Sequence, residues 1–183
     1  MKTRGFEVLT AFQNKGIQLP QRQTYGSAGY DLQAAEDVDV PSIWTLNFVR
    51  IFRMIRNGHP LTELDFAKAD QVLKPIMVPT GLKAYFPEDE FLLIANRSSN
   101  SWKRYFTLAN AIGVVDSDYY NNDDNEGALN VQIINFGVRT LHIKKGERIA
   151  QAMFIKTLRV DNDQPVDRQR KSGFGSTNGG ADA

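Results

Sequence analysis

The chain of 183 residues contains no cysteine and only two histidines. The absence of cysteine excludes disulfide bonds, thiolate nucleophiles and cysteine-bound zinc or iron–sulfur clusters. The two histidines, His59 and His142, leave few donors for a zinc site or a serine–histidine triad. Any chemistry must therefore use carboxylates, arginines, hydroxyls and amides, or a bound hard cation.

The sequence also lacks an excess of charge of one sign and long apolar runs. Its 22 basic and 21 acidic side chains leave a formal net charge of +1, so no bulk field attracts nucleic acids or anionic membranes. No stretch approaches the ~20 apolar residues of a membrane helix, and the N-terminus has no apolar signal segment. We therefore expect a soluble cytoplasmic protein without nucleic-acid or membrane partners.

Most of the sequence predicts short β-strands separated by turns. Eight stretches are rich in Val, Ile, Leu or Phe, or alternate, and are bounded by Gly, Pro, Asn or Asp. Many short strands with frequent turns favour an all-β sandwich or barrel over a parallel α/β sheet, and the chain length suits one domain. The stretches are 5–12, 28–34, 76–86, 90–96, 111–117, 128–136, 140–144 and 148–157.

The segment near 43–72 departs from this pattern and predicts a helical insertion. Its first half places four apolar residues on one helical stripe, away from three arginines. Thr62 is the predicted N-cap of a second helix, with Asp65 at the capping-box position. One interpretation is a helix that packs on the β domain or lies at a contact between subunits. The other is a hairpin that binds a partner or a membrane surface, although three arginines are too few for firm membrane attachment. The stripe consists of Trp44, Phe48, Ile51 and Ile55.

The segment AIGVVDSDYYNN, residues 111–122, ends a predicted strand with two aspartates and two tyrosines. The residues alone leave three interpretations open: a solvated strand end, a metal site, or a place where a water is aimed at a substrate. The C-terminal RQRKSGFGSTNGGADA, 168–183, is small and polar around Phe174. Alone it cannot bury enough surface to become ordered, but its composition also suits a flap that orders over a ligand.

Five motifs in order give the sequence its strongest signal. They resemble the motifs of the trimeric deoxyuridine triphosphatases (dUTPases), and a further stretch, VPTGL (78–82), also matches. Each motif is weak evidence alone, whereas five in the right order are strong evidence. The motifs are SAGYDL (27–32), NRSSN (96–100), NAIGVVDSDY (110–119), GERIAQ (146–151) and GFGSTN (173–178).

The resemblance implies a fold, an assembly and a reaction. It implies one jelly-roll-like β domain over 1–168 with the insertion near 43–72, and a flexible flap over 169–183. It implies a homotrimer whose active sites draw on several subunits. The implied reaction is hydrolysis of dUTP to dUMP and pyrophosphate with Mg²⁺, which limits uracil incorporation into DNA and supplies dUMP for thymidylate synthesis.

By the same resemblance, Asp116 orients and helps deprotonate the water that attacks the α-phosphorus. Phosphoryl transfer depends mainly on positioning and charge neutralisation. Asp31 matches an aspartate near the metal; Mg²⁺ keeps waters and binds mainly through substrate phosphates, so one carboxylate contacting those waters suffices. The alternatives are a strand-end carboxylate facing solvent for Asp116 and a turn residue bonded to its own backbone for Asp31.

The remaining predicted site residues bind the substrate. Tyr119 would pack under C2′ and exclude ribonucleotides, while Asn110 and the backbone around Gly113 would present fixed donors and acceptors to uracil. Glu147 and Arg148 are expected to pair with each other. The predicted phosphate-binding residues are Arg97, Ser98, Ser99 and Gln151.

The flap would complete the site. Phe174 would stack on uracil, while Ser176, Thr177 and the backbone amides around Gly175 would close on the γ-phosphate. The arginine of the fifth motif falls at Gln169 in this chain. We assign its role to the neighbouring Arg170, with Arg168 as the alternative.

Departures from the family pattern and two rival functions remain. Ser99 replaces a usual glycine, and a polar insertion at 121–125 follows Tyr119; one interpretation is a longer turn that does not touch the base pocket, and the sequence leaves its effect open. A dCTP deaminase shares the fold and an Arg-Ser-Ser motif, but Gln132 stands where that family needs a carboxylate beside C4. The second rival is a nucleotide-gated regulatory protein that binds a partner through the 43–72 insertion.

Overall fold

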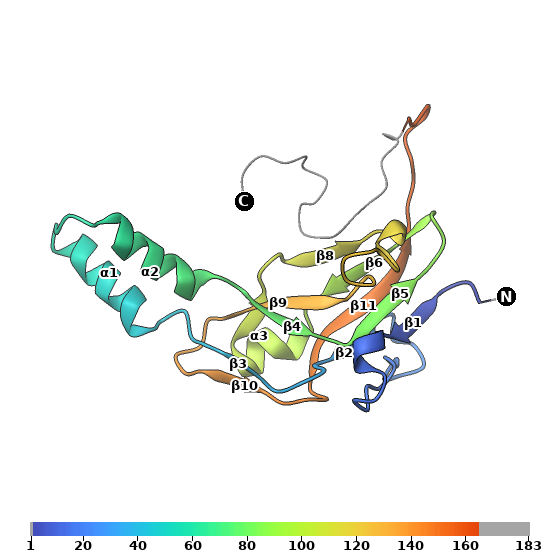
Figure 1. The fold of residues 1–183 in the computed structure, drawn as a ribbon, viewed down its shortest axis with the longest axis horizontal. Helices are drawn as coiled ribbons and strands as arrows, with labels where there is room; N and C mark the ends of the chain where they lie inside the picture. The colour runs from blue at the N-terminus through green and yellow to red at the C-terminus, as the bar shows by residue number, and fades with distance from the viewer. Residues whose placement is uncertain (1, 165–183) are drawn as a thin grey trace.

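The computed structural model describes residues 2–164, and most of its regular structure is antiparallel β-sheet (Figure 1). One sheet of four strands has the order β2, β11, β6, β8, and one of three strands has the order β4, β9, β7; β1 pairs with β5 and β10 with β3. The strands are β1 (Gly5–Val8), β2 (Tyr30–Gln33), β3 (Val38–Val40), β4 (Ile76–Pro79), β5 (Leu82–Tyr85), β6 (Glu90–Ala95), β7 (Phe106–Leu108), β8 (Ile112–Val115), β9 (Asn130–Asn135), β10 (Leu141–Ile143) and β11 (Arg148–Lys156).

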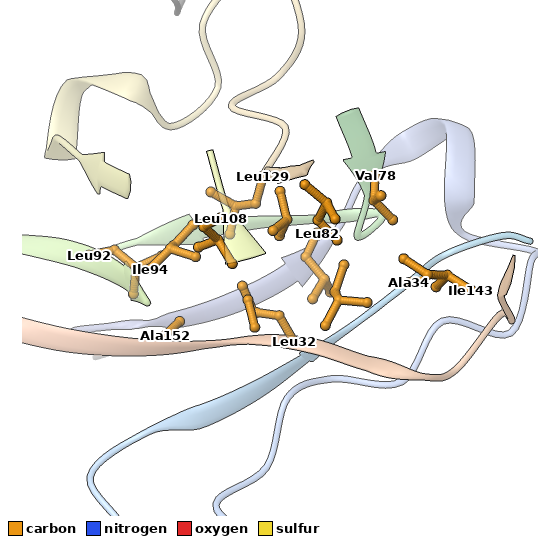
Figure 2. Packing of buried hydrophobic residues seen from close by; sticks show 14 of the residues in the cluster. Leu32, Ala34, Val78, Leu82, Leu92, Ile94, Leu108, Leu129, Ile143 and Ala152 are labelled. Carbon is orange, nitrogen blue, oxygen red and sulfur yellow. The ribbon is translucent and has the colours of Figure 1, made fainter. Parts of the chain in front are cut away.

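One hydrophobic core joins all four sheets (Figure 2). Strands β6 and β9 alternate strictly between buried and half-buried residues, as expected where one face of a strand meets the core. Leu32, Leu82, Ile133 and Ile143 come from different sheets and are at most 1% exposed. This packing confirms the predicted all-β class.

The strand predictions hold in position and differ in detail. Each of the eight predicted stretches contains a strand, but 76–86 contains two, β4 and β5, separated at Gly81 with φ +70. Strands β3 and β7 have three residues each and were not predicted, nor was the short helix α3 (Ser98–Arg104). Elements this short carry little periodic signal, and β10, which is equally short, was predicted only within a longer stretch.

The predicted helical insertion is present as a hairpin of α1 (Leu46–Arg56) and α2 (Glu63–Leu73), which extends from the β body (Figure 1). The capping box of α2 is confirmed, since Asp65 Oδ2 accepts from Thr62 N at 3.1 Å and Thr62 Oγ1 accepts from Asp65 N at 3.3 Å. Trp44 precedes α1, so its placement on the helical stripe was wrong; its Nε1 donates to Phe136 O at 3.0 Å. Within residues 2–164, no helix is long and apolar enough to cross a membrane.

The predicted flap, 169–183, lies outside the described residues. The same applies to five of the predicted site residues, whose roles stay predictions. These are Arg170, Phe174, Gly175, Ser176 and Thr177.

Candidate active site

The first half of the candidate site is a pocket of about 350 Å³ at β6, β8 and β9, which we call the base pocket. It brings together three predicted residues, Asn110, Gly113 and Tyr119. Apolar walls combined with a few convergent polar groups are typical of small-molecule sites. The lining residues are Ile94, Asn110, Gly113, Val114, Val115, Tyr119, Ala128, Leu129, Asn130 and Gln132.

A tight turn between β7 and β8 sets the position of Asn110. Ala111 adopts φ +58, and Ile112 N donates to Asn110 O at 2.6 Å. A non-glycine residue in the left-handed region is uncommon, and such conformations gather at functional sites. A Cβ at Gly113 would lie 3.5 Å from Asn110 Nδ2, so a larger residue there would stand against this amide and narrow the pocket.

Asp116 lies at the rim of the base pocket. It is the N-cap residue of the short 3₁₀ helix η2 (Ser117–Tyr119), and Asp116 O accepts from Tyr119 N at 3.1 Å. Val115 and Tyr119, which stand before and after it in the chain, both line the pocket. Among residues 2–164, no group of three or more His, Asp or Glu side chains could hold a metal ion, so the rim offers one half-buried carboxylate rather than a metal cage.

Two amides of the base pocket, Asn130 and Gln132, were not among the predicted site residues, although the comparison with the deaminase had placed Gln132 beside C4 of the pyrimidine. They are two residues apart on β9 and alternate with the core residues Leu129, Val131 and Ile133, and therefore point away from the core. An alternating strand with polar residues on one face was visible in the sequence. It did not indicate what that face would line.

No residue of the 121–125 insertion lines the base pocket, but the insertion contacts one of the residues that do. Tyr119 is 6% exposed, and its Oη accepts from Asn125 Nδ2 at 3.0 Å and donates to Ala128 O at 3.2 Å. Because Tyr119 lines the pocket, the inserted loop contacts a pocket wall directly.

The second half of the candidate site is a cleft of about 210 Å³, which we call the phosphate cleft. All five predicted residues of the metal and phosphate group in the described part of the chain lie here. The lining residues are Gln23, Ser27, Gly29, Asp31, Arg97, Ser98, Ser99 and Gln151.

Two arginines share one carboxylate in the phosphate cleft. Arg97 Nε donates to Asp31 Oδ1 at 2.9 Å, and Arg148 Nη1 donates to Asp31 Oδ2 at 3.2 Å. Asp31 is 9% exposed. Two guanidinium groups against one carboxylate leave a net positive charge, and the guanidinium fork suits phosphate oxygens.

Arg148 was paired wrongly from the sequence. It pairs with Asp31, whereas Glu147 Oε2 lies 2.6 Å from Arg104 Nη2. Glu147 precedes β11, whereas Arg148 is its first residue, and the two side chains reach different partners.

Glycine and asparagine residues of the motifs shape the phosphate cleft. A Cβ at Gly29 would lie 2.7 Å from Gln151 Oε1, so only glycine lets this glutamine pack where it does. Gln151 Nε2 in turn donates to Asn96 O at 3.0 Å. Asn100, which is 1% exposed, donates to Asn96 Oδ1 and to Ile149 O and thereby ties α3 to β11.

The base pocket and the phosphate cleft lie on opposite faces of the four-stranded sheet. Gln151 pairs in register with Asp31 and with Ala95, while Ile94 pairs with Gly113. Ala95 and Ile94 are neighbours on β6. The side chains in register with Ala95 and those in register with Ile94 therefore lie on opposite faces of the sheet. Asp31 and Gln151 line the phosphate cleft, and Ile94 and Gly113 line the base pocket. One chain therefore keeps its two half-sites apart.

The loop after Tyr119 is anchored on its outer side. Glu126 Oε2 accepts from Thr10 N at 3.2 Å and from Thr10 Oγ1 at 3.0 Å, and Lys83 Nζ lies 3.5 Å away. The backbone N–H and then the hydroxyl of Thr10 lower the pKa of Glu126 below its ordinary value. The ionised Glu126 carboxylate therefore stabilises the folded protein at pH values above its ordinary pKa. This stabilisation is lost as the pH falls through the lowered pKa of the folded state. At Tyr120, a hydrogen bond to Glu7 raises the phenol pKa.

Comparisons with known proteins match this chain to dUTPases. A family model described as dUTPase matches residues 67–178. The chain is 41% identical to a deoxyuridine 5'-triphosphate nucleotidohydrolase of Lactococcus lactis, over 97% of this chain and 99% of that protein. It is 32% identical to a protein of the same name in Brucella melitensis, over 89% of this chain and 86% of the relative.

Solved structures give the same result for the fold. The crystal structure of dUTPase from Streptococcus mutans superposes with a TM-score of 0.66 at 33% identity, covering 86% of this chain and 99% of that chain. A dUTPase from phage phi11 of S. aureus, solved with its species-specific insert visible, gives a TM-score of 0.60 at 17% identity over 91% and 97% of the two chains. The second likeness supports the fold alone. Together with the mostly-strand architecture, the first confirms the predicted jelly-roll-like β domain.

Proposed function

The chain belongs to the dUTPase family and hydrolyses dUTP to dUMP and pyrophosphate, and we propose that each active site joins the base pocket of one protomer to the phosphate cleft of another. The observation that carries this proposal is the placement of the two half-sites on opposite faces of one sheet. A substrate with its base in one half and its phosphates in the other needs two chains. A closed homotrimer, in which each chain gives one half to each of two sites, meets this need.

The base pocket recognises the deoxyuridine part of the substrate. Asn110 and the backbone beside Gly113 face a space that is lined by apolar residues and by two further amides, Asn130 and Gln132. Uracil carries an acceptor at O4 and a donor at N3, where cytosine has the reverse, so fixed amides that match uracil are left unpaired by cytosine. The ring of Tyr119 closes the pocket on the sugar side and leaves no room for a 2′-hydroxyl.

Asp116 holds the attacking water from the rim of the base pocket. A carboxylate is a weak base at neutral pH, so aiming the water at the α-phosphorus contributes as much as accepting its proton. As the water oxygen bonds to phosphorus, the bond to the β-phosphate oxygen breaks and pyrophosphate leaves. The product dUMP remains in the base pocket until the site opens.

The phosphate cleft neutralises the triphosphate. Arg97, Ser98 and Ser99 reach phosphate oxygens from the start of α3, with Gln151 beside them. Positively charged, preorganised donors aimed at developing charge are the main source of catalysis in such sites. The flap residues 169–183, including Phe174 and Arg170, close over the nucleotide and exclude other water.

The residues of the phosphate cleft fit a magnesium ion carried by the substrate. Asp31 already accepts from two arginines, so a contact through a metal-bound water suits it better than direct coordination. Mg²⁺ prefers oxygen ligands and is often held by one or two carboxylates together with substrate phosphates. When bound, the ion neutralises phosphate charge, while Asp31 orients its waters.

The base pocket argues against the rival deaminase activity. Deamination needs an acid–base group beside C4 of the pyrimidine, and no aspartate or glutamate lines this pocket among residues 2–164. The 43–72 insertion as a surface for a regulatory partner stays a prediction. Hydrolysis of dUTP keeps uracil out of DNA and supplies dUMP for thymidylate synthesis, a role we assign to the cytoplasm.

A substrate panel tests the reaction. We expect pyrophosphate release from dUTP with Mg²⁺ to exceed that from dCTP by at least about a hundredfold, because cytosine leaves buried groups unpaired. Release from UTP should also be lower, because the Tyr119 ring leaves no room for the 2′-hydroxyl, and dTTP tests whether the pocket admits a 5-methyl group. Chelation of Mg²⁺ should lower the rate, and its return should restore it. Pyrophosphate and ammonia are assayed in parallel; ammonia released from dCTP would contradict the assignment.

A further inference from the structure

The orientation of the Asn125 side chain is fixed by four hydrogen bonds. Its Oδ1 accepts from Gly127 N at 3.0 Å, from Ala128 N at 3.2 Å and from Asn122 Nδ2 at 3.0 Å. Because these N–H groups require an oxygen, the amide nitrogen must point the other way. It points to Tyr119 Oη, 3.0 Å distant.

Asn122 supports the same arrangement from the backbone side. It is 9% exposed, and its Nδ2 donates to Tyr119 O at 2.8 Å. Its Oδ1 accepts from Asp124 N at 3.1 Å and from Asn125 N at 3.0 Å. The two asparagines therefore hold Tyr119 at both ends, one at the carbonyl and one at the hydroxyl.

The turn itself requires a glycine next to these contacts. Gly127 has φ +81, and a Cβ there would lie 2.6 Å from Tyr119 O. Glu126, in the same turn, is bound to Thr10. The loop is thus tied to the pocket wall on one side and to a distant part of the chain on the other.

We propose that Asn125, supported by Asn122, is a positioning residue that fixes the Tyr119 ring against the sugar and so sets the discrimination between deoxyribo- and ribonucleotides. This inference rests on the proposed function of the base pocket. A ring that excludes the 2′-hydroxyl of a ribonucleotide must keep its position when that group contacts it. The Tyr119 hydroxyl, with one donor and one acceptor partner in a buried place, resists such a shift because moving it would leave polar groups unpaired.

A double-mutant cycle tests the inference. Tyr119→Phe keeps the ring and the loop but removes the hydroxyl, whereas Asn125→Ala removes its partner. Each change should lower the ratio of kcat/KM for dUTP over UTP by about fivefold or more, the effect of one net hydrogen bond. The double variant should lose no more than the worse single variant, because both changes break the same contact.

Two further variants separate positioning from folding. Asn125→Asp keeps an acceptor for the loop amides but cannot donate to the Tyr119 hydroxyl, whose one hydrogen goes to Ala128 O, so it should keep the loop and still lower the dUTP/UTP ratio as Tyr119→Phe does. Asp123→Ala, an exposed residue of the same loop, should leave the ratio unchanged. The melting temperature is measured for every variant.

Three outcomes would overturn the inference. They are an unchanged dUTP/UTP ratio in Tyr119→Phe, an additive loss in the double variant, and an equal loss for both nucleotides in Asn125→Ala, which would show a merely structural role. If the native protein hydrolyses dUTP and the variants give any of these results, the positioning role alone is refuted. A native protein inactive on dUTP refutes the proposed function as well.

Discussion

Asp116→Asn is expected to lower kcat for dUTP by at least ~10²-fold, within the usual range of ~10²–10⁴ for general-base assistance. The amide has nearly the shape of the carboxylate but cannot accept the proton of the attacking water. Binding should persist, because the base pocket and the phosphate cleft keep their own residues. Single-turnover pyrophosphate release measures the chemical step, and calorimetry with a non-hydrolysable dUTP analogue and Mg²⁺ measures binding.

The matched control for this prediction is Asp123→Asn, the same chemical change in an exposed residue of the following loop. It should keep the native rate. If Asp116→Asn also kept a near-native rate, the water would be aimed by another group and the role of Asp116 would have to be withdrawn.

Arg97→Met is expected to lower kcat/KM for dUTP by about 10²–10³-fold, the usual cost of removing one preorganised donor from a developing anion. The protein should still fold, because Arg148 continues to pair with Asp31 and the carboxylate is not left buried without a partner. Initial-rate kinetics give the loss, and thermal unfolding shows whether the fold is kept.

Arg53→Met, on the exposed surface of α1, controls for the loss of one positive charge from the whole molecule. Arg97→Lys distinguishes charge from geometry, since lysine keeps the charge but cannot form the two-pronged contact; it should recover only part of the activity. Unaltered kinetics in Arg97→Met would mean that Arg97 serves only to hold Asp31.

Local sequence patterns could predict the strands and the motifs because both are local properties. Alternation in β9 and the capping box at Thr62 depend on residues a few positions apart, and both are present. The grouping of Arg97 with Gln151 also followed from motifs, and these residues line one cleft.

Other features could not be predicted because they depend on register and on long-range contacts. Arg148 reaches Asp31 only because β11 pairs with β2 in one register. Asn125 contacts Tyr119 only because the loop folds back on its own start. The division of the site between two faces requires knowing that Ile94 and Ala95, neighbours in sequence, face opposite ways in a sheet with a specific strand order.

The sharing of each active site between protomers is tested most directly by complementation. Asp116→Asn chains keep an intact phosphate cleft and Arg97→Met chains keep an intact base pocket, and each variant alone is expected to be nearly inactive. Unfolded together in equal amounts and refolded, they should regain roughly a quarter of the native activity on dUTP, because random assembly pairs two intact halves in that share of the sites. A mixture no more active than its two parents would show that both halves of a site come from one chain, and would contradict the shared site.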